Sequence, residues 1–340
     1  MFPLSKLFCN TFGSYRKSSI NEIYADTSNP NRIGYLKIID FLINNDFGIL
    51  VDDPATLPSL ARDFESPFSI TNSIVSTDSN SPDLLYLSIK RLVDLRIQAL
   101  RIDDIGTMRL AVLEKIEELT KRSTIEQIYI RTQFTSYSEQ PNCQLSSRFR
   151  KIIYYNSPQD VVTERKNNSR IDVKYYSKSI SYKDCGYIKK NFFTNNLPFF
   201  TESQRHNTCL NRKICIDTEG NIKNCPAMAK SYGNIRDTSL KEAIEKSGFK
   251  DLWYICKDQI DVCKDCEFRY MCTDCRCFIK DPDNIYSQPA KCPYNPYICL
   301  WEGQEGYVPV EECGAYSRET GFVPDKKRIK ELNKRIWGEE

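Results

Sequence analysis

Cysteine is the residue type in this chain whose number and spacing point to chemistry. Eight of the 15 cysteines form one ordered pattern between residues 209 and 292. Its members are Cys209, Cys215, Cys225, Cys263, Cys266, Cys272, Cys275 and Cys292. Thiolate is a soft ligand, and four thiolates select zinc or an iron–sulfur cluster. Two four-thiolate metal sites are therefore the simplest use of the pattern.

Composition limits the class of protein and the cellular compartment to which this chain could belong. A net charge of +3 argues against a dedicated nucleic-acid binder, which would concentrate many more unpaired Lys and Arg residues. No run of about 18 apolar residues exists, so no membrane span is expected, and the N-terminus is too short and broken for a signal peptide. We expect a cytoplasmic protein, in which clustered cysteines are more often metal ligands than disulfides. The single histidine, His206, excludes a His-rich metal site.

Hydrophobic periodicity predicts alternating strands and helices ahead of the cysteines. Strands are expected at 68–77, 99–105 and 125–132, with further candidates at 151–156 and 170–176. The first helix is expected to begin with Ser81 as N-cap and Pro82 at its first position, and the second contains Val112, Ile116 and Leu119. This order implies parallel strands joined by right-handed crossovers. The predicted fold class is α/β, either a degenerate partial barrel or an open parallel sheet.

The remaining segments predict smaller units around this sheet. Residues 213–225 predict a hairpin with Gly220 at its tight turn. A helix over residues 35–43 and a strand over 47–51 suggest a small N-terminal winged-helix-like module. Near the C-terminus, Ile329, Leu332 and Ile336 form an apolar stripe on a charged helix, which favours docking on its own domain over binding a partner.

We divide the chain into four parts on this basis. Residues 1–65 form the winged-helix-like module, which would recognise a peptide, and residues 66–200 form the α/β partial barrel. Residues 201–300 form a cysteine-rich domain with little periodic core, as expected where metal replaces apolar packing. Residues 301–340 form a C-terminal extension with the amphipathic helix.

The order of the cysteines resembles the SPASM domain of radical SAM peptide maturases. Cys209 is followed by Gly220-x4-Cys225, then by Cys263-x2-Cys266-x5-Cys272-x2-Cys275, and finally by Cys292. In that family these positions hold two [4Fe–4S] clusters. The resemblance implies a first cluster on Cys209, Cys215, Cys225 and Cys275, and a second on Cys263, Cys266, Cys272 and Cys292. The family has three residues where this chain has two between Cys272 and Cys275, so Cys277 competes with Cys275 as a ligand.

Several nearby residues have both a functional and an ordinary interpretation. Basic side chains close in sequence could offset the negative charge of the clusters, or could simply form a solvated surface. They are Arg212, Lys213, Lys264, Arg269 and Arg276. His206 either forms a hydrogen bond near the first cluster or packs as an ordinary side chain, and we favour packing. Cys256, Cys299 and Cys313 are interpreted as spare or buried thiols.

Radical chemistry on S-adenosylmethionine is not expected. It needs a Cys-x3-Cys-x2-Cys loop after the first barrel strand, whereas residues 76–82 contain no cysteine. Upstream of Cys209 only Cys9, Cys143 and Cys185 occur, and they are widely scattered. Zinc stays an alternative to iron, because Cys263-x2-Cys266 and Cys272-x2-Cys275 would also suit a zinc ribbon.

A closer resemblance is to the SPASM-domain peptide maturases of grasp-with-spasm systems. It rests on residues 200–226, including Asp217-Thr-Glu-Gly-Asn-Ile-Lys-Asn-Cys-Pro226, and on residues 257–276. The resemblance implies a role in maturing a ribosomally synthesised precursor peptide beside an ATP-grasp ligase, by presenting the peptide or by electron transfer. A non-catalytic scaffold with structural clusters and a zinc-binding interaction module are the alternatives. No catalytic residue is assigned.

Overall fold

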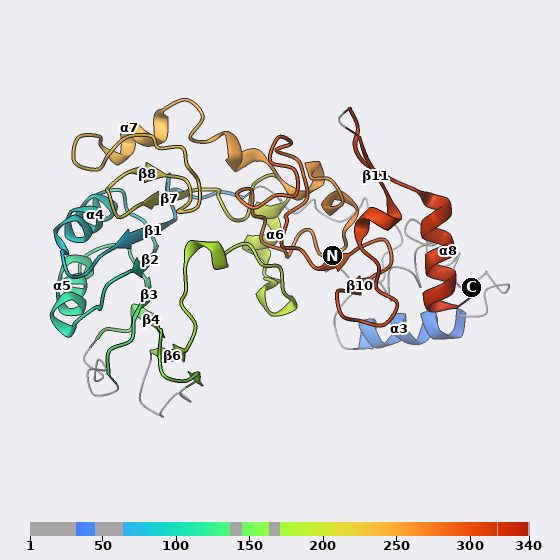
Figure 1. Ribbon diagram of the computed structural model, residues 1–340, viewed down its shortest axis with the longest axis horizontal. Coiled ribbons are helices and arrows are strands. Elements are labelled where there is room, and N and C mark those ends of the chain that lie inside the picture. The colour runs from blue at the N-terminus through green and yellow to red at the C-terminus, as the bar shows by residue number, and fades with distance from the viewer. Residues whose placement is uncertain (1–31, 45–63, 137–144, 163–170, 318, 339–340) are drawn as a thin grey trace.

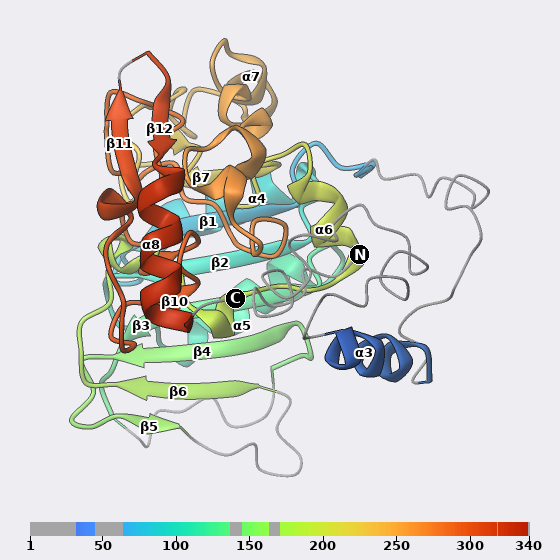
Figure 2. The same ribbon diagram turned by 90° about the vertical axis from the view of Figure 1, so that its right-hand side faces the viewer.

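A computed structural model of the chain describes residues 32–44, 64–136, 145–162, 171–317 and 319–338. One eight-stranded sheet has the strand order β5-β6-β4-β3-β2-β1-β7-β8 (Figures 1 and 2). The strands are β1 (Asn72–Thr77), β2 (Ala99–Asp104), β3 (Gln127–Gln133), β4 (Phe149–Tyr155), β5 (Val161–Val162), β6 (Asp172–Tyr176), β7 (Lys213–Ile216) and β8 (Ile222–Lys223). The α-helices are α3 (Arg32–Asn44), α4 (Asp83–Asp94), α5 (Leu110–Thr120), α6 (Leu197–Ser203), α7 (Leu240–Glu245) and α8 (Lys326–Trp337).

The sheet is mostly parallel and open, which confirms the predicted α/β class. Strands β1, β2, β3, β4 and β6 run parallel in adjacent pairs, and β7 pairs parallel to the other side of β1. Only the short edge strands β5 and β8 are antiparallel to their neighbours. Because β5 and β8 lie at opposite edges, the sheet does not close into a barrel.

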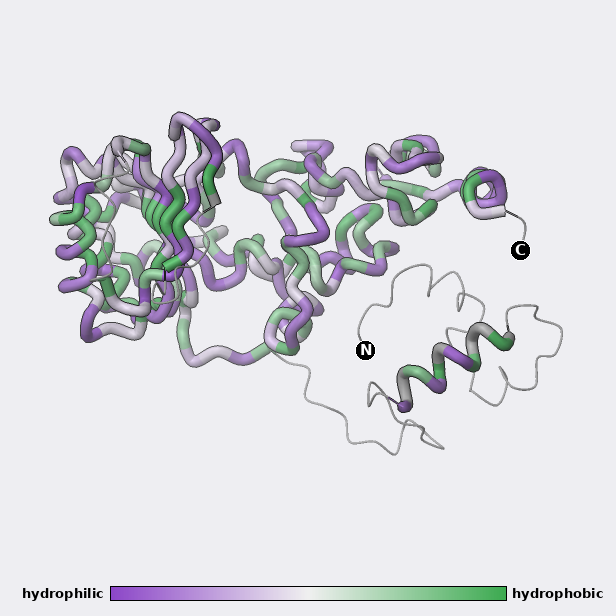
Figure 3. The backbone as a smooth tube through the Cα atoms, turned by 90° about the horizontal axis from the view of Figure 1, so that it is seen from below, coloured by the Kyte–Doolittle hydropathy of each residue, from purple (hydrophilic) through white to green (hydrophobic). Residues whose placement is uncertain are grey.

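Apolar residues of the predicted strands and helices form the main core on one face of the sheet. Helices α4 and α5 cover that face, and the strand centres are the most apolar part of the tube in Figure 3. In β2 the side chains of Leu100 and Ile102 point into this layer and are fully buried, as are Ile89 and Leu92 of α4. Each such side chain contributes about 1.5–3 kcal/mol on burial, so this layer holds the sheet in place.

The other face of the sheet carries charged residues. Arg101 and Arg131 both pair with Asp103, at 3.0 Å and 2.5 Å, and Lys151 pairs with Asp172 at 3.3 Å. The segments that contain the cysteines lie on this side, opposite α4 and α5 (Figures 1 and 2). The cysteine-rich region therefore faces the polar surface of the sheet.

The start of the first βα unit differs from the prediction. Strand β1 begins at Asn72 and α4 at Asp83, with Pro82 in the N-cap position and no side-chain cap, so Ser81 is not the N-cap. The reason is the preceding loop, in which the Ser81 amide donates to the Asp78 carbonyl. The buried Asp104 carboxylate fixes this loop by accepting from the backbone and hydroxyl of Ser79 at 2.8 and 2.7 Å.

The terminal helices follow the predicted pattern. Helix α3 includes the apolar run at 35–43, whereas the predicted strand at 47–51 lies outside the described residues. Leu332 of α8 is buried in a small second core, and the Trp337 indole donates to the Ile298 carbonyl at 3.1 Å. Helix α8 is thus docked on its own domain. No helix among the described residues has the length and apolarity to cross a membrane.

Short elements complete the cysteine-rich and C-terminal regions. Two antiparallel pairs are β9 (Tyr294–Asn295) with β10 (Leu300–Trp301), and β11 (Gly314–Ser317) with β12 (Gly321–Pro324). The 3-10 turns are η4 (Tyr182–Asp184), η5 (Lys190–Phe192), η6 (Asp251–Tyr254), η7 (Lys257–Gln259), η8 (Cys263–Asp265) and η9 (Val310–Cys313). Cys263 lies in η8 and Cys215 on β7, whereas the other predicted ligands lie in loops between the helices, strands and turns named above.

The predicted hairpin at 213–225 is present, and it does more than expected. It forms β7 and β8 around Gly220, and β7 extends the main sheet by pairing Cys215 with Ile74 of β1. Part of the cysteine pattern is therefore built on the edge of the α/β sheet.

Gly220→Ala is expected to destabilise the protein by about 1–2 kcal/mol. Gly220 has a φ of +89°, which costs an L-residue roughly that amount. An added Cβ would also lie 3.0 Å from Asn234 Oδ1. Gly303→Ala is the matched control, because Gly303 has a φ of +86° with nothing within 4 Å of the added Cβ. Denaturant unfolding should show the larger loss of unfolding free energy for Gly220→Ala. Equal losses in the two variants would show that the close contact of the added Cβ with Asn234 contributes nothing.

Candidate metal centres

The four thiols predicted for the first cluster come from four places in the chain. Cys209 follows α6, Cys215 lies on β7, Cys225 follows β8, and Cys275 lies in a loop after η8. The pKa of the Cys225 thiol is raised to about 12, mainly by burial; Cys209 also acts to raise it, whereas Lys213 acts to lower it. Burial and then Cys209 likewise raise the pKa of Cys275, and burial and then Cys225 raise that of Cys215. The four residues therefore form one electrostatically connected group, hereafter the first group.

Two further thiols lie beside the first group. Burial raises the pKa of Cys277 to about 11, with contributions from Cys275, Cys209 and Cys185. Cys277 donates to the Ala227 carbonyl at 3.1 Å. Sequence analysis named Cys277 as a competitor of Cys275, and the structure keeps both near Cys209. Cys185 was noted from the sequence only as one of the scattered upstream cysteines, and only the folded chain brings it here.

The segment around Cys185 is fixed to the cysteine-rich region by named contacts. Lys291 Nζ donates to the Cys185 carbonyl at 2.9 Å, and a Cβ added to Gly186 would lie 3.1 Å from Cys275 Sγ. Burial lowers the pKa of Arg101, but Asp103 and Cys185 outweigh it and raise that pKa. The Cys185 segment thus joins the first group to the charged face of the sheet.

The four thiols predicted for the second cluster also influence one another electrostatically and are hereafter the second group. Cys263 belongs to η8, Cys266 follows it, Cys272 lies in the next loop, and Cys292 precedes β9. Burial raises the pKa of all four thiols, to about 11 for Cys263. Cys263 and Cys272 further raise the pKa of Cys266, and Cys263 does so for Cys292. None of the eight predicted ligands forms a disulfide.

Lys257 is the functional residue that sequence analysis missed at the second group. Its side chain is only 4% exposed, and its ammonium lies 3.8 Å from Cys263 Sγ and 3.5 Å from Asp274 Oδ1. Burial lowers the pKa of Lys257, but Cys263, Cys272, Asp274 and Cys292 outweigh it and raise that pKa well above its usual value. A buried ammonium thus faces three of the four thiols.

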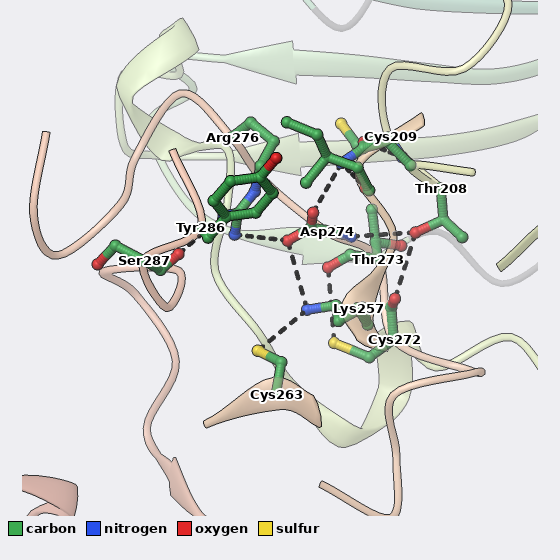
Figure 4. A network of polar contacts seen from close by, with 12 residues as sticks. Thr208, Cys209, Lys257, Cys263, Cys272, Thr273, Asp274, Arg276, Tyr286 and Ser287 are labelled. Carbon is green, nitrogen blue, oxygen red and sulfur yellow. Dashed lines mark hydrogen bonds and ion pairs between the residues drawn. The ribbon is translucent and has the colours of Figure 1, made fainter. Parts of the chain in front are cut away.

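Asp274 is the second residue that was missed, and it organises the polar contacts between the groups (Figure 4). Its fully buried carboxylate accepts from Asn207 Nδ2 at 2.7 Å and from Arg276 Nη2 at 2.7 Å, besides pairing with Lys257. The Asn207 side chain in turn accepts from the Cys209 amide at 3.0 Å. The network therefore runs from the second group, through Asp274, to a ligand of the first.

The five basic residues singled out from the sequence divide into two kinds. Lys213 Nζ donates to Cys209 Sγ at 3.4 Å, and Arg276 acts through Asp274. The other three point elsewhere: Lys264 pairs with Asp261, Arg269 with Asp258, and the Arg212 guanidinium donates to the Phe68 carbonyl.

His206 lies in an aromatic contact. Its ring meets Phe64 edge-on at 6.1 Å and Tyr254 at 5.6 Å between centroids, in line with the packing interpretation. Cys313 also matches its interpretation as a buried thiol, since it lies in the second core and its sulfur accepts from Asn295 Nδ2 at 3.3 Å.

The donor chemistry of both groups fits an anionic metal centre. All eight donors are thiols, and each group has an ammonium within 3.4–3.8 Å of a sulfur. Among the described residues, no three His, Cys, Asp or Glu side chains lie close enough together to hold a single ion. A tetrahedral zinc site would bring its sulfurs to about 3.8 Å from one another, given Zn–S bonds of about 2.3 Å. A four-iron cluster separates its thiolates further, because iron and sulfide lie between them.

Comparison with known proteins adds no family to this description. No protein-family model matches the chain, and no curated protein matches it.

Proposed function

We propose that the first and second groups each hold a [4Fe–4S] cluster, in an iron–sulfur protein related to the SPASM-domain peptide maturases. The observation that carries this proposal is the buried charge at the second group. Asp274 neutralises only one of the two cations Lys257 and Arg276, all of them 4% exposed or less. Burying an unpaired charge costs several kcal/mol, so an anionic partner is required. Four thiolates around a metal centre would supply it, and the order of the cysteines favours an iron–sulfur cluster over zinc.

We also propose a role for each part of the chain. In this proposal residues 66–200 are a degenerate radical-SAM-like partial barrel, and residues 201–300 are a SPASM iron–sulfur domain. Residues 1–65, of which the structure describes 32–44 and 64–65, would recognise a peptide. When bound, the clusters would supply one-electron chemistry, and Lys213 and Lys257 would hold positive charge beside their thiolates.

The biological role that we propose is maturation of a ribosomally synthesised peptide together with an ATP-grasp ligase. The chain would bind and present the precursor, and the clusters would shape that site or pass electrons. Support comes from the cysteine order and from the position of the first group against the charged face of the sheet, at Arg101 and Asp103.

Reconstitution tests this role directly. The full chain would be combined with an ATP-grasp ligase and a precursor peptide encoded beside it, and the peptide mass would be followed with time. We expect faster or altered modification with the wild-type chain than with Cys225→Ala, which lacks a predicted ligand. Identical products and rates with and without the chain would contradict the proposal. A change in rate without a new product would favour presentation over electron transfer.

A further inference from the structure

The two groups of thiols differ in the charge that the protein places beside them. At the first group, Lys213 is half-buried and carries the contact with Cys209, and Arg101 acts on Cys215 together with the carboxylates of Asp103 and Asp217. At the second group, Lys257 is buried and acts on Cys263, Cys272 and Cys292. Water therefore screens the charge of Lys213, whereas the buried cations Lys257 and Arg276 share the carboxylate of Asp274.

Arg276 keeps the Asp274 carboxylate from neutralising Lys257 fully. The Arg276 guanidinium pairs with the same oxygen, Asp274 Oδ1, at 2.7 Å, closer than Lys257 at 3.5 Å. It also donates to the carbonyls of Ile285 and Ser287 at 3.0 and 2.8 Å, which fixes it in place. Figure 4 shows Asp274 between the two cations, with the Lys257 ammonium between Asp274 and the Cys263 sulfur. The excess positive charge thus lies on the side of the second group.

A positive charge in a dry environment favours whichever cluster state is more negative. Reduction adds one electron and hence one negative charge, so a nearby buried cation raises the reduction potential. We propose that Lys257, positioned by Asp274 and Arg276, makes the second centre the electron-accepting one of the pair. An electron supplied by a chemical reductant would then reside first on the second centre, without proton transfer. This inference rests on the proposed two-cluster function.

Redox titration of the full-length protein tests this inference, with dithionite as reductant and electron paramagnetic resonance as readout. Wild-type protein should show two midpoint potentials. Lys257→Met should lower the higher midpoint potential by at least about 59 mV, which is a tenfold change in a one-electron equilibrium. The lower midpoint potential should stay unchanged. Asp274→Asn, which removes the negative charge and keeps one of the two acceptor oxygens, should raise the same potential. Lys257→Arg should keep it close to wild type.

Lys264→Met is the matched control, because Lys264 follows the ligand Cys263 directly but is partly exposed and pairs with Asp261. Both potentials should stay unchanged in it. Shifts of the same sign in Lys257→Met and Asp274→Asn, or an equal shift in Lys264→Met, would overturn the inference. Loss of the second centre's iron in Lys257→Met would assign Lys257 a structural role instead and also overturn it. Wild-type protein without iron would reject the proposed function before any variant is compared.

Discussion

The Cys225→Ala variant should retain about half of the wild-type iron, roughly four atoms of eight, because a four-iron cluster depends on four thiolates. Cys225 follows β8 at the edge of the main sheet, and only the first group includes it. The ligands of the second group lie in other segments of the chain, between residues 263 and 292, so the second cluster should remain. Iron and sulfide analysis of anaerobically purified protein measures the effect.

Two matched variants show whether this loss is specific. Cys143→Ala should lose no iron; Cys143 is not a predicted ligand, and it lies outside the described residues. Cys313→Ala should also keep all its iron, because Cys313 is buried in the second core. Iron loss in either control would show that the ligand assignment is wrong.

The Asp274→Ala variant should lose about 3–5 kcal/mol of unfolding free energy, the usual cost of removing one partner from a buried ion pair. Without Asp274, the ammonium of Lys257 and the guanidinium of Arg276 remain buried with no carboxylate between them. Asn207 also loses the acceptor of its side-chain hydrogen bond. Denaturant-induced unfolding under anaerobic conditions would measure the loss.

Asp258→Ala is the control for that effect. Asp258 pairs with Arg269 at 2.8 Å in the same region, but both side chains are at least 30% exposed. An exposed pair of this kind contributes about 0–1 kcal/mol. Similar losses of unfolding free energy in Asp258→Ala and Asp274→Ala would contradict the prediction, because burial of the Asp274 network would then add nothing to its contribution.

Local patterns in the sequence were sufficient for much of the fold. Strands such as β2 alternate apolar and polar residues, and helices such as α4 repeat apolar residues at helical spacing, so both could be predicted from short windows. The hairpin at Gly220 was equally local. The pairing of β7 with β1 was missed because it joins residues about 140 positions apart, and nothing within either strand specifies that partner.

The candidate site shows the same division between local and long-range information. The order of the cysteines predicted two ligand sets, which stay a prediction, whereas Cys185 comes close to Cys277 only through the fold. Lys257 and Asp274 were overlooked because charged residues in loops usually face solvent. Asp274 lies between Cys272 and Cys275, where a ligand loop leaves little room for solvation, and this position was the signal that could have identified it.

The proposal that the thiols hold two iron–sulfur clusters is tested by anaerobic purification followed by measurement of iron, sulfide and zinc per polypeptide together with the visible spectrum. We expect about eight iron and about eight sulfide, with broad absorption near ~400 nm that bleaches on reduction. Colourless protein with about two zinc ions would contradict it and indicate a structural zinc-binding domain.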